Sequence, residues 1–149
     1  SCTSIDCPVQ NLVYTNYVFM KGDGTQDTLK TDTLWIWSHR QDGSDTLLVN
    51  ALCGSSALGF SLPISYSSPE DVFYTLLADT AKQYYIDTIR IKKDNIPHFE
   101  SVDCQAAYFH SITQVSTTRH AFDSIAVHHS HVDYDVSQQH LYLYPKAER

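Results

Sequence analysis

The sequence has little of what a helical protein needs, and it has no long apolar run. Only three of its seventeen acidic residues are Glu, and the other fourteen are Asp. Glu suits helix interiors, whereas Asp competes with the helical backbone and prefers turns and caps. No stretch approaches about 18 consecutive apolar residues, so the sequence predicts no transmembrane helix. The composition therefore favours strands and turns.

Positive charge is also scarce. Ten Lys and Arg are scattered along 149 residues, the formal net charge is −7 and the pI is about 5.4. Nucleic acids require basic stripes and anionic membranes require polybasic segments, so neither is predicted to bind through charge. A chain of this length can bury a core without a metal ion. We therefore predict no cofactor and no nucleic-acid partner.

Four cysteines, Cys2, Cys7, Cys53 and Cys104, fit no zinc ribbon or redox pair. They allow two disulfides in three connectivities, and disulfides imply an oxidising compartment. A small residue followed by Cys is also what remains when a bacterial lipoprotein signal is removed. Ser1-Cys2 therefore predicts an exported chain with a lipid anchor at Cys2. An ordinary disulfide at Cys2 is the alternative.

A short motif recurs along the chain: an Asp, then a Thr or Ser, and then alternating apolar residues. Asp caps turn amides, and the alternation behind it has the period of a strand. Each copy of this motif predicts the start of a strand. The motif occurs at residues 27–29, 32–36, 45–49, 87–91 and 123–127.

Alternation and turn residues together predict about eight or nine short strands. Pro69 and the acids after it could start a helix, but the β-branched and aromatic run at 72–76 favours a strand. The pattern weakens after Pro97, where 104–112 predicts one helical turn or an irregular strand. The other predicted strands are 11–20, 33–37, 46–50, 58–64, 84–92, 122–128 and 139–144.

The fold class that follows is all-β, an antiparallel, immunoglobulin-like β-sandwich. We expect a tether at residues 1–9, one domain at 10–145 and a tail at 146–149. Period-two positions on three strands predict which side chains fill the core. Ile89, Ile91, Ile125, Val127, Leu141 and Leu143 should point inward, and Arg90, Lys92, His128 and Tyr142 should point away.

Two aromatic pairs have strand spacing. Trp35 and Trp37 share one face of a strand, with Leu34 and Ile36 on the other, and Tyr142 and Tyr144 repeat the spacing. If exposed, such pairs could form a platform on which a sugar ring stacks. If buried, they are core residues, because aromatic side chains bury a large apolar area.

Histidines cluster near the C-terminus. His128, His129 and His131, with His120 and His140, are candidate metal ligands, because neutral imidazole binds zinc and copper. In a strand, however, His129 and His131 share a face and His128 points away. Solvated turn residues are the simpler interpretation, so no metal site is predicted.

Two further motifs resemble sites. The run from Asp23 to Asp27 has oxygen ligands at alternate positions, but Leu34 stands where an EF-hand needs a bidentate Glu, so a hairpin turn explains it. For nucleophilic catalysis the candidates are Ser101 or Cys104 with a nearby base and acid, but no nucleophile elbow or Gly-rich loop accompanies them. We expect no enzyme. The candidate bases and acids are His98, His110, His120, Asp103 and Asp123.

Three segments carry a family resemblance: Pro97–Cys104, Thr117–Ile125 and Leu141–Tyr144. With the Cys2 and Cys7 pair, they resemble small Bacteroidales lipoproteins grouped as a domain of unknown function. The resemblance spans residues 85–145 and departs at 128–130, where such proteins tend to have an Asn-Pro turn. It implies an acylated N-terminal Cys, a second Cys soon after it and a β-sandwich body, and it implies no activity.

The resemblance and the residues lead to one interpretation of function. We expect an exported, lipid-anchored envelope protein that acts as a binding or structural module, on either side of the envelope, with the membrane and envelope proteins or glycans as partners. With Cys2 acylated, three thiols remain, and we predict a disulfide between Cys7 and Cys104 that leaves Cys53 unpaired. A carbohydrate-binding module of a glycan-uptake system is the first alternative. A metal-dependent or thiol enzyme is the second.

Overall fold

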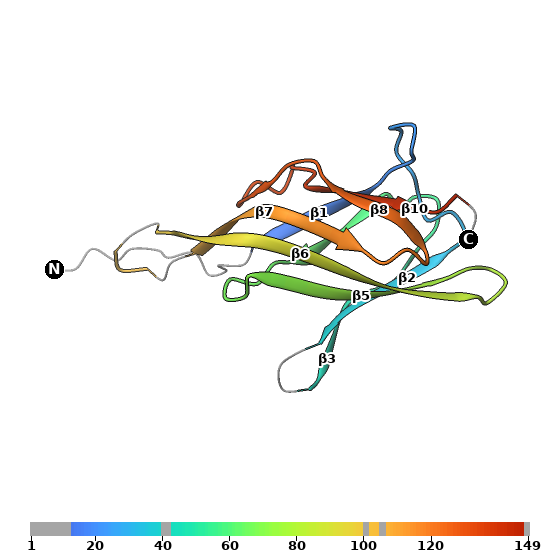
Figure 1. Ribbon diagram of the computed structural model, residues 1–149, viewed down its shortest axis with the longest axis horizontal. Helices are drawn as coiled ribbons and strands as arrows, with labels where there is room; N and C mark the ends of the chain where they lie inside the picture. The colour runs from blue at the N-terminus through green and yellow to red at the C-terminus, as the bar shows by residue number, and fades with distance from the viewer. Residues whose placement is uncertain (1–12, 40–42, 100–101, 105–106, 148–149) are drawn as a thin grey trace.

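The computed structural model describes residues 13–39, 43–99, 102–104 and 107–147 of the chain. Within those ranges it has ten strands in two sheets and no helix, so the predicted all-β sandwich is confirmed. Among the same residues, no helix is present that could cross a membrane. Figure 1 shows the two sheets as the two layers of the molecule.

The smaller sheet has four strands in the order β4-β1-β10-β8. The pair of β1 and β10 is parallel, and the other two pairs are antiparallel. Strand β4 lies at an edge, as the Pro near its end predicted. The bounds are β1 Tyr14–Phe19, β4 Gly59–Pro63, β8 Phe122–Val127 and β10 Leu141–Pro145.

The larger sheet has six strands in the order β3-β2-β5-β6-β7-β9, and every pair in it is antiparallel. Strand β6 runs through most of the length of the molecule, and β7 lies beside it (Figure 1). The bounds are β2 Thr33–His39, β3 Asp45–Cys53, β5 Glu70–Ala78, β6 Tyr84–His98, β7 Ala107–Thr117 and β9 His131–Val132.

The core lies between the sheets and follows the predicted faces with one exception. Ile89, Leu141 and Leu143 are fully buried, Ile91 is buried, and Ile125 packs against them in part. The prediction for Val127 was wrong, because β8 is an edge strand with only β10 beside it, and Val127 is exposed at its end. The four side chains predicted to point away are exposed or half-buried: Arg90, Lys92, His128 and Tyr142.

The expected break after Pro97 was wrong. Strand β6 continues through Pro97 to His98, and the whole of β7 pairs with residues 89–98 of β6. Two causes hid this pairing from the sequence pattern. Polar residues occupy inward positions there, and the register shifts between Lys92 and Lys93, opposite Gln114 and Ile112, which leaves Thr113 as an extra residue in β7.

Candidate functional site

The outer face of the six-stranded sheet carries the two tryptophans. Strand β2 alternates so that Leu34 and Ile36 are fully buried in the core. Trp35 and Trp37 therefore point to the opposite, outer face, where both are half-buried. The sequence predicted this division of the strand, and the structure places the tryptophans outside the sandwich.

An aromatic pair forms the centre of this face. Trp37 lies directly opposite Tyr74 of β5, and the ring centroids are 6.0 Å apart with an interplanar angle of 29°. Stacked rings at this distance hold each other in place, so both present fixed surfaces to solvent. Trp35 lies opposite Leu76 in the next outward-facing pair along the same two strands.

Exposed aliphatic side chains extend the surface on both sides. Leu47 of β3 lies opposite Trp37 and is 52% exposed, and Ile86 of β6 lies opposite Leu76 and is 54% exposed. Tyr84, the first residue of β6, is also exposed. We call this surface the aromatic face. Its members are Trp35, Trp37, Leu47, Tyr74, Leu76, Tyr84 and Ile86.

Polar pairs border the aromatic face along one side. Arg90 Nη1 donates to Glu70 Oε1 at 3.2 Å, and His39 Nδ1 lies 2.7 Å from Asp45 Oδ1. All four side chains belong to the same sheet and are partly or largely exposed. An apolar centre with a polar rim is the arrangement found at many recognition surfaces.

The tyrosine pair lies on the other sheet. Leu141 and Leu143 of β10 are fully buried, so Tyr142 and Tyr144 point outward from the four-stranded sheet. Tyr142 stacks on His128 with centroids 4.3 Å apart and an interplanar angle of 15°. The two predicted aromatic pairs therefore do not form one platform.

The histidine cluster does not converge on a metal site. His128 stacks on Tyr142, whereas His131 Nε2 lies 3.3 Å from Asp133 Oδ2. The ring of His129 faces the ring of His140, with the centroids 5.9 Å apart. In the described part of the chain, no three His, Cys, Asp or Glu side chains are grouped so that they could hold a metal ion.

His140 is a poor metal ligand for a further reason. It is fully buried, and its Nδ1 accepts a hydrogen bond from the Asn16 backbone N–H at 2.9 Å. The neutral ring must then carry its proton on Nε2, so neither nitrogen has a free lone pair for a metal. Burial and the neighbouring His129 lower the pKa of His140, which favours this neutral form.

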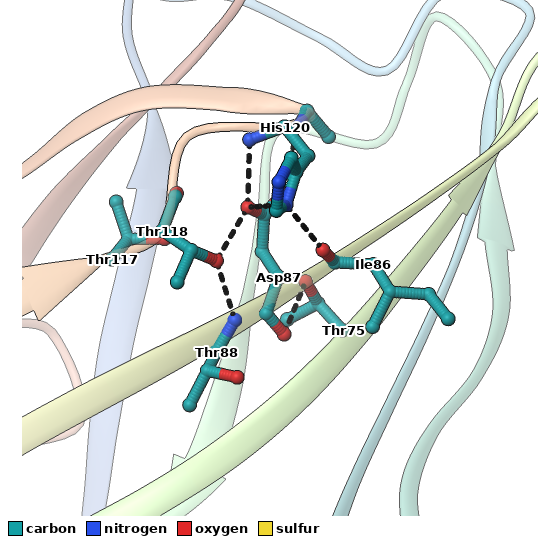
Figure 2. A network of polar contacts seen from close by, with 8 residues as sticks. Thr75, Ile86, Asp87, Thr88, Thr117, Thr118 and His120 are labelled. Atoms are coloured by element: carbon teal, nitrogen blue, oxygen red, sulfur yellow. Dashed lines mark hydrogen bonds and ion pairs between the residues drawn. The ribbon is translucent and has the colours of Figure 1, made fainter.

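Asp87 is the centre of a closed network on the inner side of β6 (Figure 2). Its Oδ1 accepts from Thr118 Oγ1 at 2.7 Å and from His120 N at 2.8 Å, and its Oδ2 accepts from Ala121 N at 2.7 Å. The carboxylate is 1% exposed. It fixes the turn between β7 and β8, so Asp87 caps turn amides as expected. The turn is not next to it in the sequence, however, and Asp87 itself lies within β6.

A second closed network surrounds Lys93 in the other half of β6. The Lys93 ammonium has no exposed surface, and it donates to Ser65 Oγ at 3.0 Å and to the Ser68 carbonyl oxygen. Asp71 Oδ1 lies 3.7 Å away, and the Asp71 carboxylate also accepts from Ser65 N and Oγ. Burial lowers the pKa of Lys93, and Asp71 opposes that shift.

His110 completes this second network. Its Nδ1 lies 2.7 Å from Asn95 Oδ1, and Asn95 Nδ2 donates to the Ser68 carbonyl oxygen at 2.9 Å. Asn95 Oδ1 must therefore accept, so His110 donates through Nδ1. Burial and the nearby Lys93 lower the pKa of His110 to about 4, which keeps the ring neutral.

The candidate catalytic groups are scattered. His110 lies in the Lys93 network and His120 in the Asp87 network, in different halves of β6. His98 stacks on Phe109 with centroids 4.3 Å apart. Asp103 and Asp123 are exposed, and Ser101 lies outside the described residues. The run from Asp23 forms the predicted hairpin turn, in which Thr25 donates to Asp23 Oδ1.

Of the cysteines, two are described. Cys104 is buried and disulfide-bonded, and Cys53 is an exposed free thiol. Cys2 and Cys7 lie outside the described residues. The pairing of Cys7 with Cys104 and the lipid on Cys2 therefore stay predictions.

These observations define a two-sheet β-sandwich with polar networks closed inside it and an aromatic face open outside it. The chain belongs to DUF6452, a family of unknown function whose model matches residues 33–145. The matched segment runs from β2 to β10 and includes the aromatic face and both networks. Comparison with curated proteins found no match, and comparison with solved structures found none either.

Sequence reasoning found the tryptophans but missed their partners. Tyr74, Leu47 and Ile86 come from three strands, and only the register of the sheet brings them beside Trp35 and Trp37. Their alternation along each strand was visible in the sequence. The pairing of β2 with β5 was not visible, because β3 and β4 lie between these two strands in the sequence.

Proposed function

We propose that this protein is an exported, lipid-anchored binding module of the bacterial envelope, without catalytic activity, that recognises its partner with the aromatic face. The observation that carries the proposal is the Trp37–Tyr74 stack on the outer side of the larger sheet. Trp, Tyr and Arg are the residues that most often dominate binding energy at interfaces. Arg90, at the border of this face, adds the third type.

The polar networks support a non-catalytic role. Each carboxylate in them accepts from neighbouring groups of the fold, and the rings of His120 and His110 are hydrogen-bonded to the Ile86 carbonyl oxygen and to the Asn95 amide oxygen. A catalytic acid or base must instead reach a reacting atom. These groups hold turns and strands together.

Anchoring through Cys2 is supported by the resemblance to envelope lipoproteins. Bacterial lipoprotein cysteines carry several acyl chains, which gives stable attachment, whereas a single chain binds only marginally. Metabolic labelling with an alkyne fatty acid tests it. We expect label on the wild type and none on Cys2→Ser, and equal labelling of the two variants would contradict the anchor.

The binding proposal is tested by photo-crosslinking in the native envelope. A photoreactive residue at Leu47 should give a discrete adduct, because this position is exposed within the aromatic face. Ser61, exposed on edge strand β4 of the other sheet, is the matched control. Equal adducts from both positions, or an adduct from Ser61 alone, would refute the use of the aromatic face.

A glycan is the second candidate for the partner, and the stacked Trp37–Tyr74 pair favours it. A sugar ring can lie on an aromatic face, and the polar rim offers hydrogen bonds from Arg90 and Glu70. Isothermal titration against a panel of envelope and plant glycans tests this. Binding that Trp37→Ala abolishes and Tyr142→Ala leaves unchanged supports a glycan, and the absence of binding to the whole panel favours a protein.

A further inference from the structure

Exposed apolar side chains gather where β6 passes into β7. Ile96 lies near the end of β6, Phe99 directly follows it and is 65% exposed, and Val102 is 97% exposed. Tyr134 reaches the same end, since its ring meets Phe109 edge-on with centroids 5.0 Å apart. We call Ile96, Phe99, Val102 and Tyr134 the apolar tip.

Tyrosines surround the base of the tip. Tyr66 is exposed and stacks on Tyr108 of β7 with centroids 5.4 Å apart, and Tyr108 lies opposite Pro97. Tyrosine is enriched at membrane interfaces, where the ring sits among the headgroups and the hydroxyl group stays in water. Protruding apolar residues with tyrosines behind them match the layers of a bilayer surface.

The chain enters the fold at this same end. The Val13 carbonyl oxygen accepts from Ile64 N at 3.4 Å, and the following residue, Ser65, contacts Lys93 in the half of β6 that leads to His98. Figure 1 shows β1 beginning on the side of the molecule where β6 ends. Cys2 precedes Val13 by eleven residues, which span at most roughly 36–40 Å.

We propose that the apolar tip lies against a phospholipid bilayer, with Phe99 and Val102 inserted among the lipids. The orientation rests on the proposed lipid anchor at Cys2, since an anchor within that reach of Val13 places this end nearest the membrane. Insertion itself needs only the tip.

The chemistry of the tip selects the kind of surface. Asp94 and Asp103 are exposed beside it, and the whole chain has a net charge of −7. Anionic headgroups would repel these carboxylates, so attachment must come from apolar burial and not from charge. We therefore expect zwitterionic phosphatidylcholine to be sufficient, with little dependence on salt.

The arrangement also has a consequence for the aromatic face. Strand β6 runs from the tip end at His98 to the far end at Tyr84, and the aromatic face includes Tyr84 and Ile86. With the tip on the membrane, the aromatic face stands away from the lipid and is free to meet a partner.

Hydrogen–deuterium exchange on vesicles tests the proposal. The full chain, produced without lipid modification and with an N-terminal histidine tag, is tethered to phosphatidylcholine vesicles that contain a nickel-chelating lipid. Peptides covering 96–104 should exchange at least threefold more slowly than in free protein. Peptides covering β3 should exchange at the same rate in tethered and free protein.

A matched pair of variants separates insertion from simple proximity. Phe99→Asp/Val102→Asp should lose the protection and should bind untethered phosphatidylcholine vesicles at least fivefold less than wild type. Val127→Asp changes an exposed apolar residue on β8 and should behave as wild type. Equal melting temperatures of the three proteins show that the fold is kept.

The outcomes are separable from those of the proposed function. Tip peptides that exchange equally in tethered and free protein, or that are protected equally in the double Asp variant, would overturn the proposal. That result leaves the fatty-acid labelling of Cys2 unaffected, because the vesicle experiment uses protein without a lipid. Conversely, unlabelled Cys2 would refute the anchor while the tip could still bind vesicles.

Discussion

The interior of the sandwich and its outer aromatic face use residue types in opposite ways. Inside, charged groups such as Asp87 and Lys93 are buried and surrounded by partners from the fold. Outside, Trp37 and Tyr74 remain partly exposed to solvent although both could fill a core. Buried polar groups are stable only when satisfied, whereas open aromatic surface usually marks recognition. The contrast fits an interior that maintains the fold, and it supports the proposal that the outer face binds a partner.

The largest effect is expected at Asp87. Asp87→Ala removes the acceptor of two backbone N–H groups, and leaves the buried Ala121 N and the part-buried His120 N without that partner. The free energy of unfolding should fall by about 4 kcal/mol. Urea denaturation measures it. Asp123→Ala, which changes an exposed acid, is the control and should stay within about 0.5 kcal/mol of wild type. An equal loss of unfolding free energy in the two variants would contradict the stabilising role of the buried Asp87 network.

Breaking the second network should cost somewhat less. Lys93→Met leaves the Asp71 carboxylate buried without its cation, and we expect a loss of about 3 kcal/mol in the free energy of unfolding. Adding Asp71→Asn removes the uncompensated charge and should recover part of the loss. Lys92→Met, on the exposed side of the same strand, should be nearly neutral. A double variant as unstable as Lys93→Met alone would contradict the assigned pairing.

His110 predicts a pH dependence with a definite sign. Its folded pKa is lowered to about 4, from about 6.5 in the unfolded chain, so the unfolded state binds the proton more readily. The stability linked to His110 is complete above pH 6.5 and is lost as the pH falls toward 4, by about 2 kcal/mol at pH 5. His110→Gln should flatten this part of the curve relative to wild type. Parallel curves for the two proteins would contradict a buried neutral His110.

The smallest stability effect is expected on the aromatic face. Trp37→Ala removes a half-buried outer side chain and should lower the free energy of unfolding by about 1 kcal/mol, whereas Ile36→Ala on the inner face should lower it by about 2–5 kcal/mol. Thermal melts of the two variants measure the difference. If Trp37→Ala costs as much as Ile36→Ala, the tryptophan serves the core and the contrast fails.

The sequence supported the class of fold because alternation is local. Strand β2 shows the principle, since its period-two pattern alone separates Leu34 and Ile36 from the tryptophans. The pattern failed at β7, where the inward positions include His110 and a bulge at Thr113 changes the faces. A polar residue that is buried with a partner looks exposed in a sequence, because its partner is distant along the chain.

The sites were less predictable than the fold for the same reason. Asp87 was recognised as a capping residue, but the amides it caps belong to a turn more than thirty residues later. The Trp37–Tyr74 stack depends on the pairing of β2 with β5, which crosses β3 and β4 in the sequence. Single residues could be named from the sequence, and their partners required the register of the sheet.

Hydroxyl-radical footprinting of the protein in its native envelope tests the central claim most directly, whether the partner is a glycan or a protein. Trp35, Trp37 and Tyr74 should be oxidised more slowly in the envelope than in purified protein, because the partner covers the aromatic face. Tyr142 and Tyr144, on the outer side of the other sheet, should be oxidised at the same rate in both. Unchanged oxidation of Trp37 and Tyr74, or protection of Tyr142 and Tyr144 instead, would contradict the assignment of function to the aromatic face.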